Sequence, residues 1–163
     1  MEWLKFLPFV WYTSMVHESN GEGKCGMKIS TKGRYALRML LDMACNQKDG
    51  PVALKDIAER QNVSKKYLEQ IALTLSQEGL LQGVRGHQGG YRLMVAPKDC
   101  NLYDILELVE GSMHPVACLD QSPNHCERCS GCDTLYVWQG LDEAIRQYLS
   151  DITLQDVLDR AKK

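Results

Sequence analysis

The sequence predicts a mainly α-helical fold with one small β-hairpin and a long C-terminal helix. Apolar residues recur at helical spacing in three segments between residues 31 and 78, two extended runs flank a glycine-rich tip, and a further helical stripe follows residue 133. The chain has 163 residues, of which 44% are hydrophobic and 25% are charged. This composition is ordinary for a globular protein, and the length suits one domain or a compact module with an appendage.

The first two predicted helices lie between residues 31 and 61. Ser30 or Thr31 can cap the first helix, and its apolar stripe ends near Asn46. A Gly-Pro turn at residues 50–51 separates it from a short second helix, which we expect to run from about residue 54 to residue 61.

A third helix follows after a tight turn, which predicts a helix-turn-helix arrangement. Asn62 tolerates a left-handed backbone conformation, and Ser64 can cap the helix that follows. We expect this helix to run from about Lys65 to Glu78 and to stop at Gly79.

Exposed residues near the start of the third helix are of the types that contact nucleic acid, since a recognition helix meets base edges with its N-terminal turns. Lys65 and Lys66 can contact phosphate or guanine. Gln70 can bond an adenine edge, and Glu69 can accept from the exocyclic amine of cytosine. The alternative is a solvated helix face in a protein-binding bundle.

Residues 80–95 predict a β-hairpin, and its position directly after a helix-turn-helix makes it a wing. Two extended runs flank a glycine-rich tip at residues 86–90. Arg85 and Arg92 stand at the base of this tip, where glycines permit close backbone approach. This pattern suits insertion beside or into a minor groove.

The C-terminal part predicts three more helices. Asn101 can cap a short one that Gly111 ends, Asp133 can cap a longer one, and Thr153 can cap a last short one. In the longer helix, apolar residues recur at alternating three- and four-residue steps, which is typical of a seam between two helices. A stripe that packs only within its own subunit is the alternative. The stripe consists of Trp138, Leu141, Ile145 and Tyr148.

Four of the seven cysteines lie within fifteen residues, in a loop of irregular composition. Gaps of two residues allow successive thiolates to point at one centre, in zinc sites and in iron–sulfur sites alike. An odd number of cysteines excludes a fully paired disulfide framework and favours metal or redox chemistry in a reducing compartment, so we expect a cytoplasmic protein. The four are Cys118, Cys126, Cys129 and Cys132.

The net charge of −2 conceals a strong asymmetry along the chain. Residues 27–98 hold twelve Lys and Arg against six Asp and Glu, whereas residues 99–163 hold five against twelve. A basic half beside an acidic half indicates that the first half meets a polyanion.

Residues 1–26 begin with an apolar and aromatic run that is too short to span a membrane, so no membrane partner is expected. We expect this segment to be a non-native or disordered leader, with native translation starting at Met27.

Four sequence segments together resemble the winged helix-turn-helix transcription regulators of the IscR/NsrR type. They are Met-Lys-Ile-Ser-Thr-Lys-Gly-Arg-Tyr-Ala-Leu from Met27, Asp-Ile-Ala-Glu-Arg-Gln from Asp56, Tyr-Leu-Glu-Gln from Tyr67 and Val-Arg-Gly-His-Gln-Gly-Gly-Tyr from Val84. These regulators are bacterial homodimers, and several hold an iron–sulfur cluster that tunes DNA binding.

The resemblance implies a homodimer on pseudo-palindromic double-stranded DNA. Residues 27–98 would be the DNA-binding domain, and residues 99–163 the cysteine-loop sensor and dimerisation region. It also implies that Glu69 and Gln70 read bases and that Arg85 enters the minor groove. The expected DNA surface comprises Lys28, Arg34, Tyr35, Ser64, Lys65, Lys66, Tyr67, Glu69, Gln70, Arg85, Gly86 and Gln88.

The resemblance further implies three cysteine ligands, the third lying six residues before a helical Trp. Cys132 stands six residues before Trp138, and Cys118 and Cys126 then fit the first two ligands. The fourth ligand stays open, because Leu135 stands where the prototype has a histidine. Cys129, His125, an acidic residue or a side chain of the partner subunit's first helix are the alternatives.

Several functions compete for the loop. An iron–sulfur cluster of the 2Fe–2S or 4Fe–4S type would make the protein a sensor, whereas four cysteines can equally hold structural zinc. A regulator that answers to a metabolite or partner protein, with zinc or no metal, is a further alternative. A ferredoxin-like electron carrier is disfavoured, because Tyr136 occupies the place of its fourth cysteine. No nucleophile–base pair indicates an enzyme.

Overall fold

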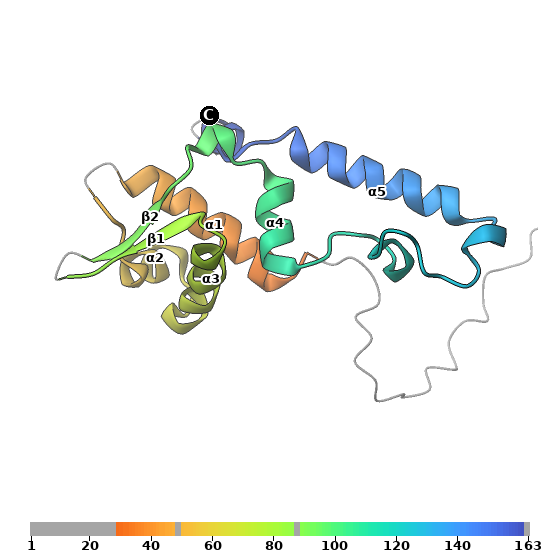
Figure 1. The fold of residues 1–163 in the computed structure, drawn as a ribbon. Helices are drawn as coiled ribbons and strands as arrows, with labels where there is room; N and C mark the ends of the chain where they lie inside the picture. The colour runs from red at the N-terminus through yellow and green to blue at the C-terminus, as the bar shows by residue number, and fades with distance from the viewer. Residues whose placement is uncertain (1–28, 48–49, 87–88, 162–163) are drawn as a thin grey trace, which may run out of the picture.

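The computed structural model describes residues 29–47, 50–86 and 89–161. The predicted leader lies outside these residues, as do Lys28 and Gln88 of the expected DNA surface. Within the described residues the fold is three helices, an antiparallel hairpin and three further helices, joined by short 3-10 turns (Figure 1). The prediction of a mainly helical protein with a small wing is therefore confirmed. Among these residues, no helix is long and apolar enough to cross a membrane.

The N-terminal body is organised around α1 (Thr31–Asn46), which packs against α2 (Leu54–Gln61) and α3 (Lys65–Gln77). Ser30 caps α1 as expected, because its side chain accepts hydrogen bonds from two backbone N–H groups of the first turn. The apolar stripes of the three helices meet in one core. Its fully buried members on these helices are Ala36, Met39, Leu40, Met43, Ile57, Leu68, Ile71, Ala72 and Leu75.

The turn between α2 and α3 has the predicted left-handed residue. Asn62 adopts a φ of 51°, and the next residue, Val63, returns a hydrogen bond of 3.0 Å to the carbonyl of Ala58. Ser64 occupies the N-cap position of α3, but its side chain makes no capping hydrogen bond, so that part of the prediction is wrong. After α3, Gly79 takes a φ of 76°, which ends the helix.

The wing is a hairpin of β1 (Leu81–Val84) and β2 (Gly90–Leu93). It is fixed to the body by Val52, whose N–H and carbonyl bond to Tyr91 at 2.8 and 2.9 Å. A Cβ at Gly90 would lie 2.4 Å from the Val52 carbonyl oxygen, so only glycine permits this approach. The wing therefore projects from the body at a defined place.

Two further helices, α4 (Leu102–Glu110) and α6 (Leu154–Ala161), complete the body. Asn101 caps α4 as predicted, accepting a hydrogen bond of 2.9 Å from a backbone N–H of the first turn. At α6, Thr153 and Asp156 each accept a hydrogen bond from the other's backbone N–H, at 3.2 and 2.8 Å, which is a capping box closed by aspartate.

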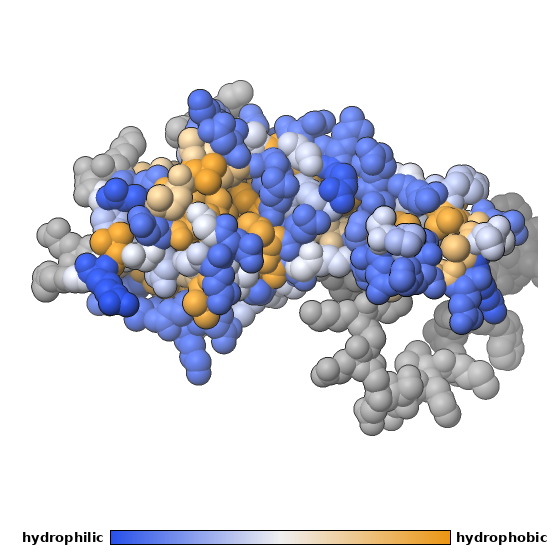
Figure 2. Space-filling view, viewed as in Figure 1, coloured by the Kyte–Doolittle hydropathy of each residue, from blue (hydrophilic) through white to orange (hydrophobic). Residues whose placement is uncertain are grey.

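The longest C-terminal helix, α5 (Leu135–Ser150), projects from this body as an arm (Figure 1). Thr134 is its N-cap residue, so the prediction of Asp133 is wrong by one position. None of its residues is fully buried. Figure 2 shows apolar residues among hydrophilic ones on the body and also at the end of the molecule where α5 and the cysteine loop lie.

The predicted apolar stripe of α5 is divided between two faces. Trp138 and Ile145 are half-buried, whereas Leu141 and Tyr148 are 43% and 68% exposed. Val137, also 43% exposed, lies within about 40° of both exposed residues on a helical wheel. The exposed residues thus form an apolar face that this chain does not cover.

A buried carboxylate ties α1 to the end of α2. Asp42, 7% exposed, accepts hydrogen bonds from Arg60 Nε at 2.9 Å and from Gln61 Nε2 at 3.0 Å. Burial alone would raise the pKa of Asp42, but the bonds from Arg60, Gln61 and Asn46 and the charge of Arg60 outweigh burial and hold that pKa below its ordinary value. This network fixes the residues that lead into the turn before α3.

Candidate nucleic-acid interface and cysteine loop

The first turns of α3 present a polar surface. Lys65, Lys66, Glu69 and Gln70 are all exposed, as the sequence predicts. Lys65 Nζ lies 3.1 Å from Glu69 Oε1, in an exposed pair that contributes only a few tenths of a kcal/mol to helix stability, at about 0.3–0.5. Its more important effect is on charge, since Lys65 offsets the carboxylate on a surface expected to face a polyanion.

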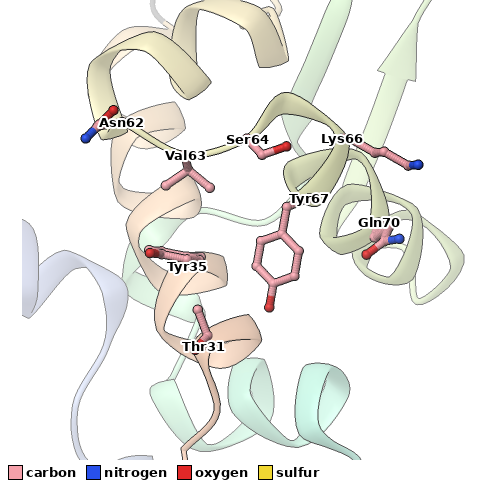
Figure 3. Close-up of a pocket in the computed structure, with 8 residues that line it drawn as sticks. All are labelled: Thr31, Tyr35, Asn62, Val63, Ser64, Lys66, Tyr67 and Gln70. Carbon is pink, nitrogen blue, oxygen red and sulfur yellow. The ribbon is translucent and has the colours of Figure 1, made fainter.

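A surface pocket of about 630 Å³ lies where the N-terminal turns of α1 and α3 approach each other (Figure 3). The ring of Tyr67 points from α3 toward α1, while Lys66 and Gln70 stand on the outer side of α3. Five of its lining residues belong to the expected DNA surface, and the other three come from the turn and the start of α1. The lining consists of Thr31, Tyr35, Asn62, Val63, Ser64, Lys66, Tyr67 and Gln70.

Aromatic and cationic side chains hold the two walls of this pocket together. The rings of Tyr35 and Tyr67 meet edge to face, with centroids 5.8 Å apart. Arg38 lies 5.2 Å from the Tyr35 centroid and donates to the Gln61 carbonyl at 2.6 Å. Arg34 lies along α1, where it donates to the carbonyl and hydroxyl groups of the preceding turn. The shape of the pocket therefore depends on how the N-terminal half of α1 is positioned relative to α3.

The wing supplies further cationic groups. Arg85 directly follows β1 and is exposed, and Arg92 on β2 is exposed as well. Gly86 takes a φ of 121°, which an L side chain rarely adopts. The base of the wing tip is thus positively charged with an unobstructed backbone. The structure places Arg85 and Gly86 on the wing and away from the pocket lining.

The cysteine loop joins α4 to α5. Short 3-10 turns at Ala117–Leu119 and Cys129–Gly131 interrupt an otherwise irregular path. All four of its cysteines are half-buried and none forms a disulfide. His125, one of the alternative ligands, is exposed. These thiols, Cys118, Cys126, Cys129 and Cys132, are therefore available for coordination.

Asn124 organises the middle of this loop. Its side-chain oxygen accepts from the Cys126 N–H at 2.8 Å, and the Sγ of Cys129 lies 3.9 Å from its backbone carbonyl. The Asn124 side-chain Nδ2 is buried and has no hydrogen-bond partner. A buried amide donor beside two cysteines fits a site whose acceptor is sulfur or another bound group, since such donors are rarely left unpaired.

The thiols have not converged, however. Among the described residues, no three His, Cys, Asp or Glu side chains lie close enough to share a metal ion. Cys132 lies 3.5 Å from the Thr134 hydroxyl, and this hydrogen bond, with the backbone N–H groups of Thr134 and Leu135, lowers the pKa of the Cys132 thiol. The donor set therefore fits a soft metal or an iron–sulfur cluster by its chemistry, and the four ligands stay a prediction.

Contacts that the sequence did not reveal hold the arm against α4 and the segment that follows it. His114 Nδ1 lies 2.7 Å from Asp142 Oδ1, and both side chains are about four-fifths buried, at 22% and 20% exposure. Arg146 lies 4.4 Å from the ring centroid of Tyr103, and Leu149 packs on the same small apolar cluster. Partners 28 and 43 residues apart leave no local pattern, so sequence reasoning could not pair them.

Comparison with known proteins agrees with this arrangement. Residues 29–160 match the family model described as Rrf2, iron-dependent transcriptional regulator. A putative HTH-type transcriptional regulator of Haemophilus influenzae is 37% identical over 134 residues, which cover 82% of this chain and 88% of that protein. The HTH-type transcriptional regulator IscR of Vibrio atlanticus is 37% identical over 132 residues, covering 81% and 75%.

Solved structures show the same fold. IscR of T. potens aligns with a TM-score of 0.66 and 39% identity, over 83% of this chain and 89% of that one. CymR, the global cysteine regulator of B. subtilis, aligns with a TM-score of 0.66 and 36% identity, over 82% and 98%. These relatives are named as regulators rather than enzymes. With its helix-turn-helix, its wing and a family match over nearly all described residues, this chain belongs to the Rrf2 family of transcriptional regulators.

Proposed function

We propose that this protein acts as a homodimer that binds a pseudo-palindromic operator, and that an iron–sulfur cluster in the loop from Cys118 to Cys132 tunes its affinity. The observation that carries the DNA part is the pocket between α1 and α3, which gathers five of the expected DNA contacts at one place. Family membership implies DNA binding, and the residues named here are our assignment.

The geometry separates affinity from readout. Lys66 lies at the exposed start of α3 and suits a phosphate contact, which carries no sequence information. Gln70 lies one turn further along the helix, where its amide can bond an adenine edge in the major groove. The exposed Arg85 at the wing suits the adjacent minor groove.

Gln70→Ala and Lys66→Ala are expected to have different signatures on DNA. Loss of Gln70 should weaken operator binding by about 1–3 kcal/mol and relax the preference at one base position. Loss of Lys66 should weaken binding to all sequences alike. It should also reduce the magnitude of the slope of log affinity against log salt by about one, because one phosphate contact is lost. Fluorescence anisotropy with the operator, a point-substituted operator and an unrelated duplex, at several salt concentrations, measures both effects.

Thr74→Ala provides a control for these variants, since the half-buried Thr74 lies on α3 beyond the pocket lining and its hydroxyl donates to the backbone carbonyl of Gln70. If the two variants had the same profile, the assignment of roles would be wrong. If the wild-type protein bound no promoter fragment in either metal state, the DNA-binding proposal would fail altogether.

The homodimer is supported by the uncovered face of α5. Val137, Leu141 and Tyr148 are exposed on one side of a helix that projects from the body. Single exposed apolar residues are common, but three on one face of a long helix are typical of an interface. A second copy of the same helix would cover them and set the spacing of the two recognition helices.

The iron–sulfur proposal rests on the donor chemistry of the loop and on the buried, unpaired amide of Asn124. Cys118, Cys126 and Cys132 would hold the cluster, with Cys129 as the open fourth ligand. When bound, such a cluster supplies a redox-active group whose oxidation or loss changes the charge of the loop. The protein's own part is to orient the thiols and to pass their position on to α4 and α5.

Replacing Cys118, Cys126 or Cys132 singly by serine is expected to abolish cluster binding, whereas Cys45→Ser should have no effect, since Cys45 is exposed near the end of α1. Cys129→Ser decides the fourth ligand: retained iron assigns that ligand to another group. Anaerobic purification with visible absorbance and iron and sulfide analysis provides the measurement. A colourless wild-type protein with stoichiometric zinc would contradict the proposal.

A regulator with zinc or with no metal in the loop is the second candidate. The observation on the side of a metal-free loop is that, among the described residues, no three His, Cys, Asp or Glu side chains are grouped so that they could hold a metal ion. The same metal analysis separates the two, because zinc would be retained aerobically and no sulfide would be found.

A further inference from the structure

The last residue of α4 is bonded to the first turn of α1. Glu110 Oε1 accepts hydrogen bonds from the backbone N–H of Ser30 at 2.9 Å and of Gly33 at 3.1 Å. In return, Lys32 Nζ donates to the Val109 carbonyl at 3.0 Å. A carboxylate thus meets the N-terminus of one helix and a cation meets the C-terminus of the other, so both helix dipoles favour the joint.

Gly33 is the residue that makes this contact possible. A Cβ at this position would lie 2.2 Å from Glu110 Oε1 and 3.1 Å from a methyl carbon of Leu106. Gly33 is buried within α1, where its helical backbone needs no glycine. Glycine is therefore needed at position 33 because it allows α4 to approach α1 closely.

The joint lies between the two functional parts of the molecule. On one side, Glu110 is followed by Gly111, at a φ of 91°, and then by the segment that carries the cysteines. On the other side, Thr31 and Tyr35 belong to the same end of α1 and line the pocket at the DNA surface. Figure 1 shows the end of α4 beside the start of α1.

We propose that Glu110 is a positioning residue that transmits the state of the cysteine loop to the DNA-contacting end of α1. A shift of the loop moves the end of α4, and Glu110 passes that shift to Ser30 and Gly33. The end of α1 then moves against α3 through the edge contact between Tyr35 and Tyr67. This inference rests on the proposed function, because it gives a route from the sensor to the DNA surface.

The first test uses metal-free protein and so does not depend on a cluster. Glu110→Ala is expected to speed amide hydrogen exchange at Ser30 and Gly33 and to weaken operator binding by about fivefold. Glu110→Gln should restore much of the affinity, because its side-chain oxygen still accepts. Glu107→Ala removes the same charge from the same helix, but Glu107 accepts a hydrogen bond from Tyr103 of α4 rather than from the backbone of α1, so both readouts should stay unchanged.

Gly33→Ala provides an independent variant, since its methyl group would displace the carboxylate. It should weaken operator binding as Glu110→Ala does. In the double variant, the further loss of affinity caused by Gly33→Ala should be smaller than the loss that Gly33→Ala causes by itself, because the carboxylate that the methyl group displaces is already gone. Full additivity of the two substitutions would overturn the proposal.

The second test compares iron-loaded protein with chelator-stripped protein. In the wild type the two states should differ in operator affinity by at least about fivefold, and in Glu110→Ala this ratio should approach one. A merely structural loss would lower both affinities and keep the ratio. An unchanged ratio in Glu110→Ala would overturn the transmission role while leaving the proposed function intact. Equal wild-type affinities would refute iron–sulfur tuning and the transmission role together.

Discussion

Leu141→Glu is expected to convert the protein from a dimer to a monomer and to lower its affinity for a two-half-site operator by about a hundredfold or more. Leu141 lies at the centre of the exposed apolar face of α5, between Val137 and Tyr148. Burying a carboxylate there would leave it without a partner in an apolar interface. Sedimentation equilibrium measures the assembly, and titration of the operator measures the affinity.

Gln139→Glu is the matched control, because it adds the same charge at an exposed position on the opposite side of α5. A duplex with a single half-site separates assembly from folding, since the Leu141 variant should bind it as the wild type does. A Leu141→Glu protein that remains dimeric at micromolar concentration would contradict the assignment of this face.

Asp42→Ala is expected to lower the free energy of unfolding by about 2–3 kcal/mol. The Asp42 side chain is 3% exposed, and its loss removes the charged acceptor of Arg60 and the acceptor of Gln61. The value stays below that for a fully buried ion pair, because the Arg60 side chain is 40% exposed and can be solvated. Urea denaturation followed by circular dichroism provides the measurement, with Glu59→Ala as an exposed acidic control on α2.

The same substitution should have a smaller effect in acid. The pKa of Asp42 in the folded protein lies below its ordinary value of 3.8. Such a group contributes stability above its unfolded pKa and loses that contribution as the pH falls through the lower folded value. The difference between wild type and Asp42→Ala should therefore be constant near neutral pH and shrink below about pH 4. A difference that grew in acid would contradict this account.

Much of the fold of the body is predictable from the sequence because the interactions that determine it are between residues close together in the chain. The stripe of α1, the left-handed Asn62 and the cap at Asn101 each depend on residues a few positions apart. The same holds for the exposed cations at the start of α3 and at the wing. Local pattern therefore identifies the fold class and, among the pocket residues, Lys66 and Gln70, whereas Tyr35, Ser64 and Tyr67 are expected at the DNA surface only from the family resemblance.

The remaining features depend on contacts between distant residues. Glu110 is 80 residues from its hydrogen-bond partner Ser30 in the sequence, and Asp42 is 18 residues from Arg60. No periodicity in the sequence predicts either contact. Trp138 and Ile145 of α5 are half-buried while Leu141 and Tyr148 are exposed, and this difference depends on how α5 packs on residues distant in the sequence. The cysteine spacing identifies candidate ligands, but a spacing contains no information on whether the thiols converge.

The local character of the cysteine loop has a consequence for how such a protein can evolve. Its hydrogen bonds at Asn124, Cys126 and Cys132 join residues within a few positions of one another, and the loop lies outside the main apolar core. Insertions, deletions or exchanged ligands there would leave the DNA-reading body folded. A lineage can therefore change the stimulus to which the molecule responds without rebuilding its operator specificity.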